Sequence, residues 1–326
     1  MDRRLLRDLT VSSVGLGCMG MSEFYGTGDD DESVAVIHRA LDLGCTFLDT
    51  ADMYGPFTNE RLVGRAIAGR RDEVVLATKF GNERKEDGSW VGVNGRPGYV
   101  HRACDASLER LGVDRIDLYQ VHWPNPAVPL RSTMAGMGRL QQEGVVANVG
   151  VSNFTLARWQ AAERALGGPV LSNQVRYSLV ARRPEREVLP WAAASDRLVM
   201  AYSPLGQGLL SGRWTPTDRP RNGVRRANPL FLAENLDRVS GLLGTLAEVG
   251  RAHDATSAQV ALAWVIRRPN TVAIPGARTV AQLESNVAAA DLDLTDDEDA
   301  ALTAASDAFS PLRLPAAVTG GLRRRG

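Results

Sequence analysis

The chain has 326 residues, of which 44% are hydrophobic and 23% are charged, and this is the composition of an ordinary globular protein rather than a disordered, collagen-like or membrane-spanning one. The 38 basic and 38 acidic residues give a formal net charge of zero, so no overall positive field is available to hold nucleic acid or an anionic membrane. We therefore expect neither nucleic acid nor a membrane as a partner.

The N-terminus and the cysteines indicate the compartment. The first residues, MDRRLLRDLTVSS, carry positive charge but lack the apolar core of a secretory signal. The three cysteines, Cys18, Cys45 and Cys104, are odd in number and have no CxxC spacing, which argues against a disulfide framework and against a structural zinc site. We expect a cytoplasmic protein with reduced, half-buried thiols.

Short apolar runs alternate with longer helical patterns along most of the chain. The helical patterns are clearest at residues 31–43, 97–111 and 130–143, and each is followed by a glycine that can end a helix. The eight apolar runs cover residues 14–17, 46–49, 74–79, 117–122, 146–151, 171–174, 198–202 and 271–274. Eight strands with crossover helices in a chain of this length predict a closed (β/α)8 TIM barrel of the α/β class. We expect residues 1–326 to form a single domain.

The main alternative is an open doubly wound sheet, which would carry a GxGxxG turn between its first strand and its first helix. Gly15, Gly17 and Gly20 match these letters within GLGCMGMSEFYGTG. The next helical pattern begins only near Asp31, so no helix N-terminus follows closely enough to receive a pyrophosphate. We interpret this glycine-rich stretch as a turn-forming loop.

Two long insertions follow predicted strand ends, where the active sites of barrels are built. Residues 80–96 follow the third strand and contain Trp90, an aromatic candidate for substrate contact, and residues 206–235 follow the seventh strand. The tail, residues 311–326, ends in three arginines and is predicted to be solvated and flexible, with an active-site flap as the alternative.

Polar side chains end three consecutive predicted strands. Asp49 ends the second strand, Lys79 the third and His122 the fourth. Tyr54 comes five residues after Asp49, and Lys79 is one of only two lysines among the 38 basic residues. Any one of these residues alone would more often belong to a structural ion pair or to a hydrogen-bonded core. On successive strand ends of a barrel, the combination indicates catalysis.

These residues suit the protonation of a carbonyl oxygen. A phenol has an ordinary pKa of about 10, and a neighbouring ammonium lowers it, so we expect Lys79, held by Asp49, to lower the pKa of Tyr54. A neutral His122 would hydrogen-bond the same substrate oxygen. The hydride would come from a nicotinamide cofactor, since no side chain supplies one. A metal-dependent hydrolase would need more converging ligands than His122, so we expect no metal.

Several segments resemble the aldo-keto reductase superfamily, from about residue 10 to about residue 305. The segments are GLGCMGMSEFYG, DTADMYG followed by Asn59 and Glu60, GVSNF at 150–154, NQVRYSLV at 173–180, YSPLGQGLLSG at 202–212 and IPGAR at 274–278. The resemblance implies a (β/α)8 barrel that holds extended NADPH across its C-terminal mouth. It also implies a catalytic tetrad in which Tyr54 is the general acid and base, its other members being Asp49, Lys79 and His122.

The resemblance further implies which residues contact the cofactor. The residues for the nicotinamide, the pyrophosphate and the adenosine end are, in that order, Ser152, Asn153, Gln174 and Tyr202; Ser203, Leu205 and Gly208; and Gly276, Arg278, Gln282 and Asn286. Tyr202 would stack on the nicotinamide ring. A helix N-terminus and an arginine at the adenosine end suit a 2′-phosphate, so NADP is expected rather than NAD.

We therefore expect an NADPH-dependent enzyme that reduces aldehyde or ketone carbonyls to alcohols and runs in reverse as an alcohol dehydrogenase. The alternative is a nucleotide-binding auxiliary subunit that senses redox state with little turnover. The expected partner is a small-molecule carbonyl compound. The sequence names neither that compound nor the oligomeric state, because pocket loops vary freely on one barrel.

Overall fold

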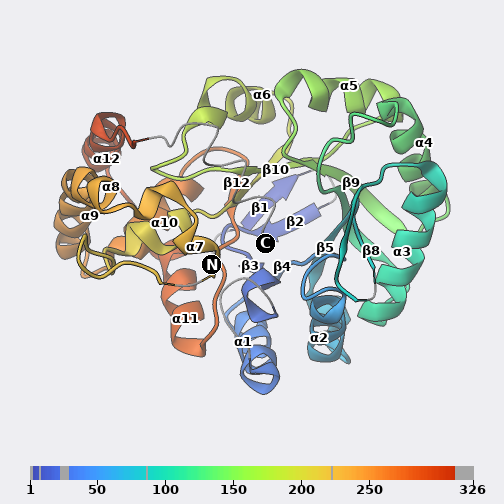
Figure 1. Ribbon diagram of the computed structural model, residues 1–326, viewed down its shortest axis with the longest axis horizontal. Coiled ribbons are helices and arrows are strands. Elements are labelled where there is room, and N and C mark those ends of the chain that lie inside the picture. The colour runs from blue at the N-terminus through green and yellow to red at the C-terminus, as the bar shows by residue number, and fades with distance from the viewer. Residues whose placement is uncertain (1–2, 7–8, 23–28, 86, 222, 313–326) are drawn as a thin grey trace.

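The computed structural model describes residues 3–6, 9–22, 29–85, 87–221 and 223–312. Helices surround a curled parallel sheet (Figure 1), whose strand order is β12-β11-β10-β9-β8-β5-β4-β3. The strands are β3 (Leu16–Gly17), β4 (Phe47–Asp49), β5 (Val75–Phe80), β8 (Ile116–Val121), β9 (Val146–Ser152), β10 (Ser172–Arg176), β11 (Leu198–Tyr202) and β12 (Thr271–Ala273). Each strand overlaps one predicted apolar run, so the prediction of eight strands is confirmed.

The two edges of the sheet meet and close the barrel. Val14, just before β3, forms a parallel bridge with Ala273 of β12, and the Gly17 amide donates to the Pro275 carbonyl at 3.0 Å. Glycine permits this close approach, because a Cβ on Gly17 would lie 2.9 Å from the Ile274 carbonyl oxygen. The fold is therefore the predicted (β/α)8 barrel.

The glycine-rich stretch belongs to this seam rather than to a loop. Gly15 precedes β3 and Gly17 ends it, while Gly20 lies in the short 3-10 helix η1 (Cys18–Met21). The first α-helix begins only at Asp30, so no helix N-terminus directly follows the GxGxxG letters. The expectation of a turn-forming loop is thus wrong for the first two glycines, whose small size lets the barrel close.

The outer layer consists of helices that pack around the sheet (Figure 1). Their bounds are α1 (Asp30–Asp42), α2 (Thr58–Ile67), α3 (Pro97–Leu111), α4 (Leu130–Gln142), α5 (Leu156–Leu166), α6 (Val188–Ala194), α9 (Ser240–Ala252), α10 (Ser257–Ile266), α11 (Val280–Ala288) and α12 (Asp296–Ala308), with 3-10 turns η2 (Arg71–Glu73), η3 (Arg183–Arg186) and η6 (Ala289–Asp291). The three clearest helical patterns form α1, α3 and α4. Gly112 ends α3 in the left-handed region, at φ 65°, as the C-terminal glycine predicts.

A hairpin that the sequence did not predict closes the N-terminal end of the barrel. Its strands are β1 (Arg3–Leu6) and β2 (Leu9–Ser12), which pair antiparallel and lie across the barrel in Figure 1. Leu9 and Val11 are buried in an apolar cluster with Leu118 and Met200 from the barrel strands. The N-terminal half of the barrel is therefore filled with apolar side chains, and polar side chains gather at the C-terminal mouth.

The two insertions form short elements at the mouth. Residues 80–96 contain the hairpin β6 (Asn82–Arg84) and β7 (Trp90–Val93), in which Trp90 is 56% exposed. Residues 206–235 contain η4 (Gly206–Ser211), α7 (Gly223–Arg226), η5 (Pro229–Phe231) and the start of α8 (Ala233–Arg238). Leu312, at the start of the predicted tail, donates its amide to Asn235 Oδ1 at 2.7 Å. Residues 313–326, for which a flexible tail was expected, lie outside the described residues.

The cysteines are more deeply buried than expected. Cys18, Cys45 and Cys104 are free and all three are buried, so the prediction of half-burial is wrong. The Cys45 thiol donates to the Val14 carbonyl at 3.2 Å, and burial raises its pKa to about 12. None of the helices in the described ranges is long and apolar enough to cross a membrane.

Candidate active site

Three polar side chains lie at the same end of three neighbouring strands. Asp49 ends β4, Lys79 lies near the end of β5, and His122 directly follows β8; these strands are adjacent in the sheet. Tyr54 reaches the same place from the turn after β4. All four side chains are buried, and Lys79 is completely so. The structure thus brings together the four residues that the sequence singled out.

The Lys79 ammonium joins the members of this cluster. It donates to Asp49 Oδ2 at 2.7 Å, to the Thr50 carbonyl at 2.8 Å and to the Tyr54 hydroxyl at 3.2 Å. The His122 ring meets the Tyr54 ring edge-on, with the ring centroids 5.9 Å apart. His122 Nδ1 is buried and has no hydrogen-bond partner in the described part of the chain. The ammonium is therefore close enough to Tyr54 to stabilise a phenolate as it forms.

Burial and charge have opposite effects on Tyr54. Burial raises the pKa of Tyr54 and the Lys79 charge lowers it, and the net change is upward. The expected lowering is therefore wrong in direction, because the loss of hydration outweighs the ammonium. The hydroxyl keeps its proton at neutral pH, as a proton donor must.

The two basic groups of the cluster, Lys79 and His122, differ in charge. Burial lowers the pKa of Lys79, but Asp49 and Tyr54 raise it by more, and the net change is upward. Burial, reinforced by the Lys79 charge, lowers the pKa of His122 well below its usual value. At neutral pH the site therefore contains an ammonium beside a neutral imidazole, in agreement with the state expected for His122.

Two glutamine side chains hold the second oxygen of Asp49. Gln174 Nε2 of β10 donates to Asp49 Oδ1 at 2.8 Å, and Gln120 Nε2 of β8 donates to the same oxygen at 3.3 Å. Gln120 is fully buried, and a Cβ on Gly150 beside it would lie 2.9 Å from its Cγ. Asp49 thus shares its charge between Lys79 on one oxygen and two amides on the other, which fixes its orientation.

The residues expected to contact a nicotinamide lie together beside His122. The Asn153 amide donates to Ser152 Oγ at 2.9 Å and to the His122 carbonyl at 3.2 Å, and it accepts from the Tyr202 hydroxyl at 3.0 Å. Ser152 Oγ in turn donates to the Gln174 carbonyl at 3.0 Å. Tyr202 keeps a half-buried ring, so an aromatic face and amide groups stand next to the tetrad, and these groups suit a flat heteroaromatic amide.

The residues expected to contact the pyrophosphate follow β11. Ser203 and Gly208 have positive φ values of 50° and 91°, and Leu205 lies between them. Arg225 Nε donates to the Gln207 carbonyl at 2.8 Å. This tight loop is braced by a cation, so its chemistry fits a phosphate-bearing group.

The residues expected at the adenosine end follow β12 and enter α11. The Arg278 amide donates to Gln282 Oε1 at 2.9 Å, and Asn286 donates to the Gly276 carbonyl at 3.3 Å. The Arg278 side chain is exposed near the N-terminus of α11. An arginine at a helix N-terminus is suited to a phosphate monoester.

Comparison with known proteins agrees with this geometry. A model of the Aldo/keto reductase family matches residues 13–307. This chain belongs to the aldo/keto reductase family. It is 44% identical to the uncharacterized oxidoreductase Rv2298 of Mycobacterium tuberculosis (strain ATCC 25618 / H37Rv), over 97% of this chain and 95% of that protein.

Two further matches agree with the assignment of this chain to the aldo/keto reductase family. The chain is 35% identical to aldo-keto reductase yakc of Schizosaccharomyces pombe (strain 972 / ATCC 24843), whose name includes NADP(+), over 88% of this chain and 86% of that one. Among solved structures, the glycerol dehydrogenase AKR11B4 from Gluconobacter oxydans matches with a TM-score of 0.87 at 28% identity, over 97% of this chain and 98% of that chain.

Gln120 is the residue of this aldo/keto reductase site that the sequence reasoning missed. The signal was present, because a glutamine interrupts the apolar run before His122, and a buried amide needs a partner. The described residues contain no group of three or more histidine, cysteine or acidic side chains that could hold a metal ion.

Proposed function

We propose that this aldo/keto reductase is an NADPH-dependent enzyme that reduces aldehydes or ketones to alcohols, and that catalyses the reverse oxidation when the cofactor ratio favours it. The observation that carries the proposal is the hydrogen bond of 3.2 Å from the buried Lys79 ammonium to the Tyr54 hydroxyl. A phenol beside a buried ammonium is suited to giving a proton to an oxygen that gains negative charge.

NADPH, when bound, would supply the hydride. Ser152, Asn153 and Gln174 would hold the nicotinamide amide, and Tyr202 would stack on the ring. The tight loop with Ser203, Leu205 and Gly208 would lie over the pyrophosphate. The residues for the adenosine end would be Gly276, Arg278, Gln282 and Asn286. The NADP(+) in the name of the yeast relative supports this choice of cofactor.

The proton would move from the Tyr54 hydroxyl to the carbonyl oxygen of the substrate. The neutral His122 imidazole would hydrogen-bond that oxygen and so orient the carbonyl. Lys79 would stabilise the tyrosinate that remains, and Asp49 with its two glutamine donors would hold Lys79 in position. Loss of hydration keeps the phenol protonated until the substrate oxygen becomes basic enough to take the proton.

Tyr54→Phe tests this proton-donor role. The variant keeps the ring and loses the hydroxyl, so we expect kcat for carbonyl-dependent NADPH oxidation to fall about 10²- to 10⁴-fold, with NADPH affinity unchanged. Stopped-flow absorbance and NADPH fluorescence titration measure the two quantities. Near-normal kcat in the variant would refute the role. Wild-type protein that retains NADPH tightly but oxidises it with none of a panel of aldehydes and ketones would favour a redox-sensing auxiliary subunit instead.

Arg278→Ala tests the preference for NADP. Removal of the guanidinium would cost about 1.5–3 kcal/mol of NADPH binding, as for other hydrogen bonds to charged groups, and would leave NADH binding nearly unchanged. Fluorescence titration with both cofactors measures the two dissociation constants. Equal losses for NADPH and NADH would show that Arg278 does not bind the 2′-phosphate.

A further inference from the structure

A pocket lies beside the barrel mouth, on the outer side of the strands. Its volume is about 200 Å³, and its apolar walls come from Val121, Pro124, Val128, Leu130 and Phe154. Val121 faces this pocket because its neighbour Gln120 points into the barrel and successive strand residues face opposite sides. Neither Tyr54 nor His122 lines the pocket. It is therefore a site of its own rather than part of the catalytic cluster.

The uncharged polar side chains in the pocket wall are already hydrogen-bonded within the chain. Both ends of the Asn125 amide are bonded, at 2.6 and 2.8 Å. Both ends of the Asn94 amide are bonded as well, at 2.8 and 3.1 Å. The Thr133 hydroxyl donates to the Gly95 carbonyl at 2.7 Å. These bonds fix the orientation of the three side chains, and the wall presents more apolar than polar surface.

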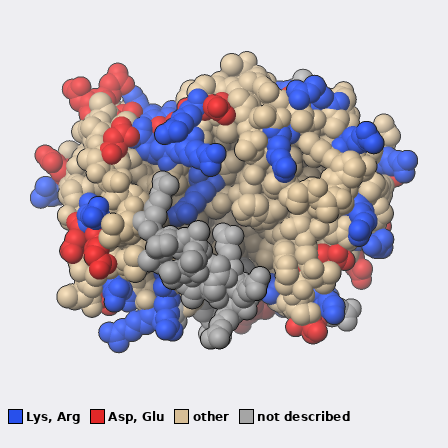
Figure 2. Space-filling model, turned by 45° about the horizontal axis from the view of Figure 1, so that its top comes forward, with Lys and Arg blue, Asp and Glu red and all other residues tan. Residues whose placement is uncertain are grey.

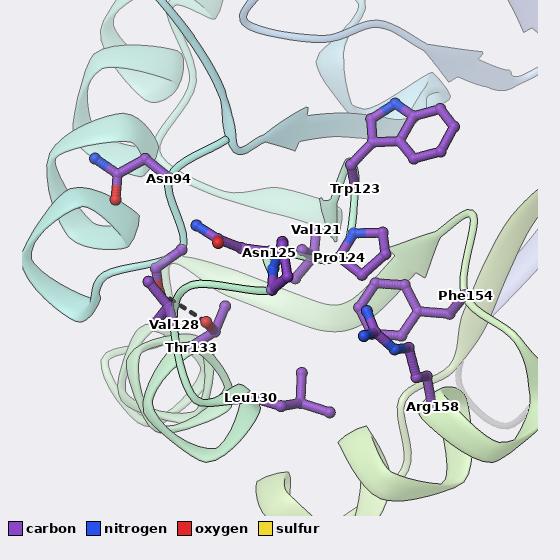
Figure 3. A pocket seen from close by; sticks show the side chains of 12 residues that line it. Asn94, Val121, Trp123, Pro124, Asn125, Val128, Leu130, Thr133, Phe154 and Arg158 are labelled. Atoms are coloured by element: carbon purple, nitrogen blue, oxygen red, sulfur yellow. Dashed lines mark hydrogen bonds between the residues drawn. The ribbon is translucent and has the colours of Figure 1, made fainter. Parts of the chain in front are cut away.

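Arg158 is the exception. It lies in the first turn of α5, is exposed, and extends toward the pocket on the same side as Phe154, opposite Asn94 and Thr133 (Figure 3). Its guanidinium has no ion pair or hydrogen bond with any residue in the part of the chain that the structure covers. The pocket thus combines an apolar body with one available cation at its edge.

We propose that this pocket binds a small carboxylic acid whose apolar part is about the size of one aromatic ring and whose carboxylate pairs with Arg158. The volume supports the size, since an apolar cavity of about 150 Å³ is enough to hold benzene. The charge supports the acid, because a guanidinium binds a carboxylate through two parallel hydrogen bonds. Mostly apolar walls with one orienting polar group are typical of small-molecule sites.

The pocket wall is continuous with the active site. Trp123 and Phe154, which both line the pocket, directly follow His122 and Asn153. The Asn153 amide donates to the His122 carbonyl at 3.2 Å, so it ties the two wall segments together next to the tetrad. Trp123 is 45% exposed. A bound acid would contact the residues that follow His122 and Asn153, so we expect it to alter turnover without occupying the place of the carbonyl substrate.

Calorimetric titration of the full chain with benzoate and with benzamide tests the site. The two probes share a ring and differ in charge. We expect saturable benzoate binding, and Arg158→Gln should weaken it about tenfold or more through loss of a charge-assisted pair, without changing the weaker benzamide binding. The matched control is Arg164→Gln, because Arg164 is also exposed and lies on α5; it should bind benzoate as the unchanged chain does.

Two further variants keep the outcome decisive. Val128→Phe fills the pocket and should abolish binding of both probes, whereas Tyr54→Phe should leave benzoate binding intact. In steady-state assays benzoate should lower kcat without raising KM for the carbonyl compound. Benzoate binding that survives Arg158→Gln but is lost in Tyr54→Phe would place the acid at the tetrad and overturn the proposal, as would the absence of saturable binding. None of these binding measurements depends on the proposed reductase activity.

Discussion

Two buried ion pairs lie on opposite faces of the same strand. On the inner face of β5, Lys79 binds Asp49 with N and O atoms 2.7 Å apart. On the outer face, Thr78 donates at 2.7 Å to Glu60, whose other oxygen binds Arg110 at 2.6 Å. Both acids are almost completely buried, so burial and pairing alone do not distinguish the two.

The difference lies in what else each pair touches. Glu60 accepts from the neutral Thr78 hydroxyl on one oxygen and from Arg110 on the other, and Arg110 also covers the Phe57 ring at 4.9 Å. This pair ties α2 to α3 and β5. The Lys79 ammonium instead has a third bond, to the titratable hydroxyl of Tyr54. A buried ion pair becomes chemically useful when it faces a group that can exchange a proton, and the side of the strand decides which groups it faces.

The largest expected effect is on turnover, in Lys79→Met. The variant removes the charge that stabilises the tyrosinate and leaves Asp49 without its cation, so kcat should fall about 10²- to 10⁴-fold, the range for loss of a tuned proton donor. Stopped-flow assays of the folded protein, checked by circular dichroism, measure this loss. A variant with kcat within a few fold of the unchanged chain would make the Lys79 pair as structural as the Glu60 pair.

Arg110→Met should affect stability and not chemistry. Removal of one partner leaves a buried unpaired carboxylate, which costs about 3–5 kcal/mol, while kcat of the folded protein should not change. Urea unfolding and assays below the transition measure the two effects. The matched control is the double variant Arg110→Met with Glu60→Gln, which removes the stranded charge and should recover part of the stability. A large loss of kcat in folded Arg110→Met would contradict this division of roles.

The smallest of these effects is expected for substitutions of Gln120, and for one of them the loss of kcat depends on pH. Gln120→Leu removes one donor from Asp49 at every pH, so kcat should fall about tenfold throughout, as for loss of a hydrogen bond to a charged group. In Gln120→Glu the new carboxyl can donate to Asp49 only while it is protonated. Burial and the Asp49 charge both raise its pKa, so kcat should stay near normal at low pH and fall as the pH rises through that value.

The pH profiles of kcat for the two Gln120 variants separate positioning from packing. If Gln120 serves only to fill space, Gln120→Leu should keep kcat near that of the unchanged chain at every pH. A uniform loss in Gln120→Leu together with a loss confined to high pH in Gln120→Glu would show that a donor to Asp49 is needed at this position.

Much of the fold follows from local pattern. The eight apolar runs each become a barrel strand, because a strand buried on both faces must be continuously apolar and bounded by polar or glycine residues. The sequence does not predict the hairpin of β1 and β2, since both strands are short and β1 begins with two arginines. The sequence predicts a loop at the seam glycines, because the need for Gly17 arises from Ile274, more than 250 residues away.

The sequence by itself determined the barrel and that Asp49, Tyr54, Lys79 and His122 lie together, because strand ends in a parallel barrel must converge whatever the details of packing. Only the tertiary structure decided the electrostatics. Burial raises the pKa of Tyr54 despite Lys79, and Gln120 and Gln174 meet on Asp49 from two separate strands. Hydration and hydrogen bonding depend on which atoms surround a group in space, and residue spacing along the chain does not contain that information.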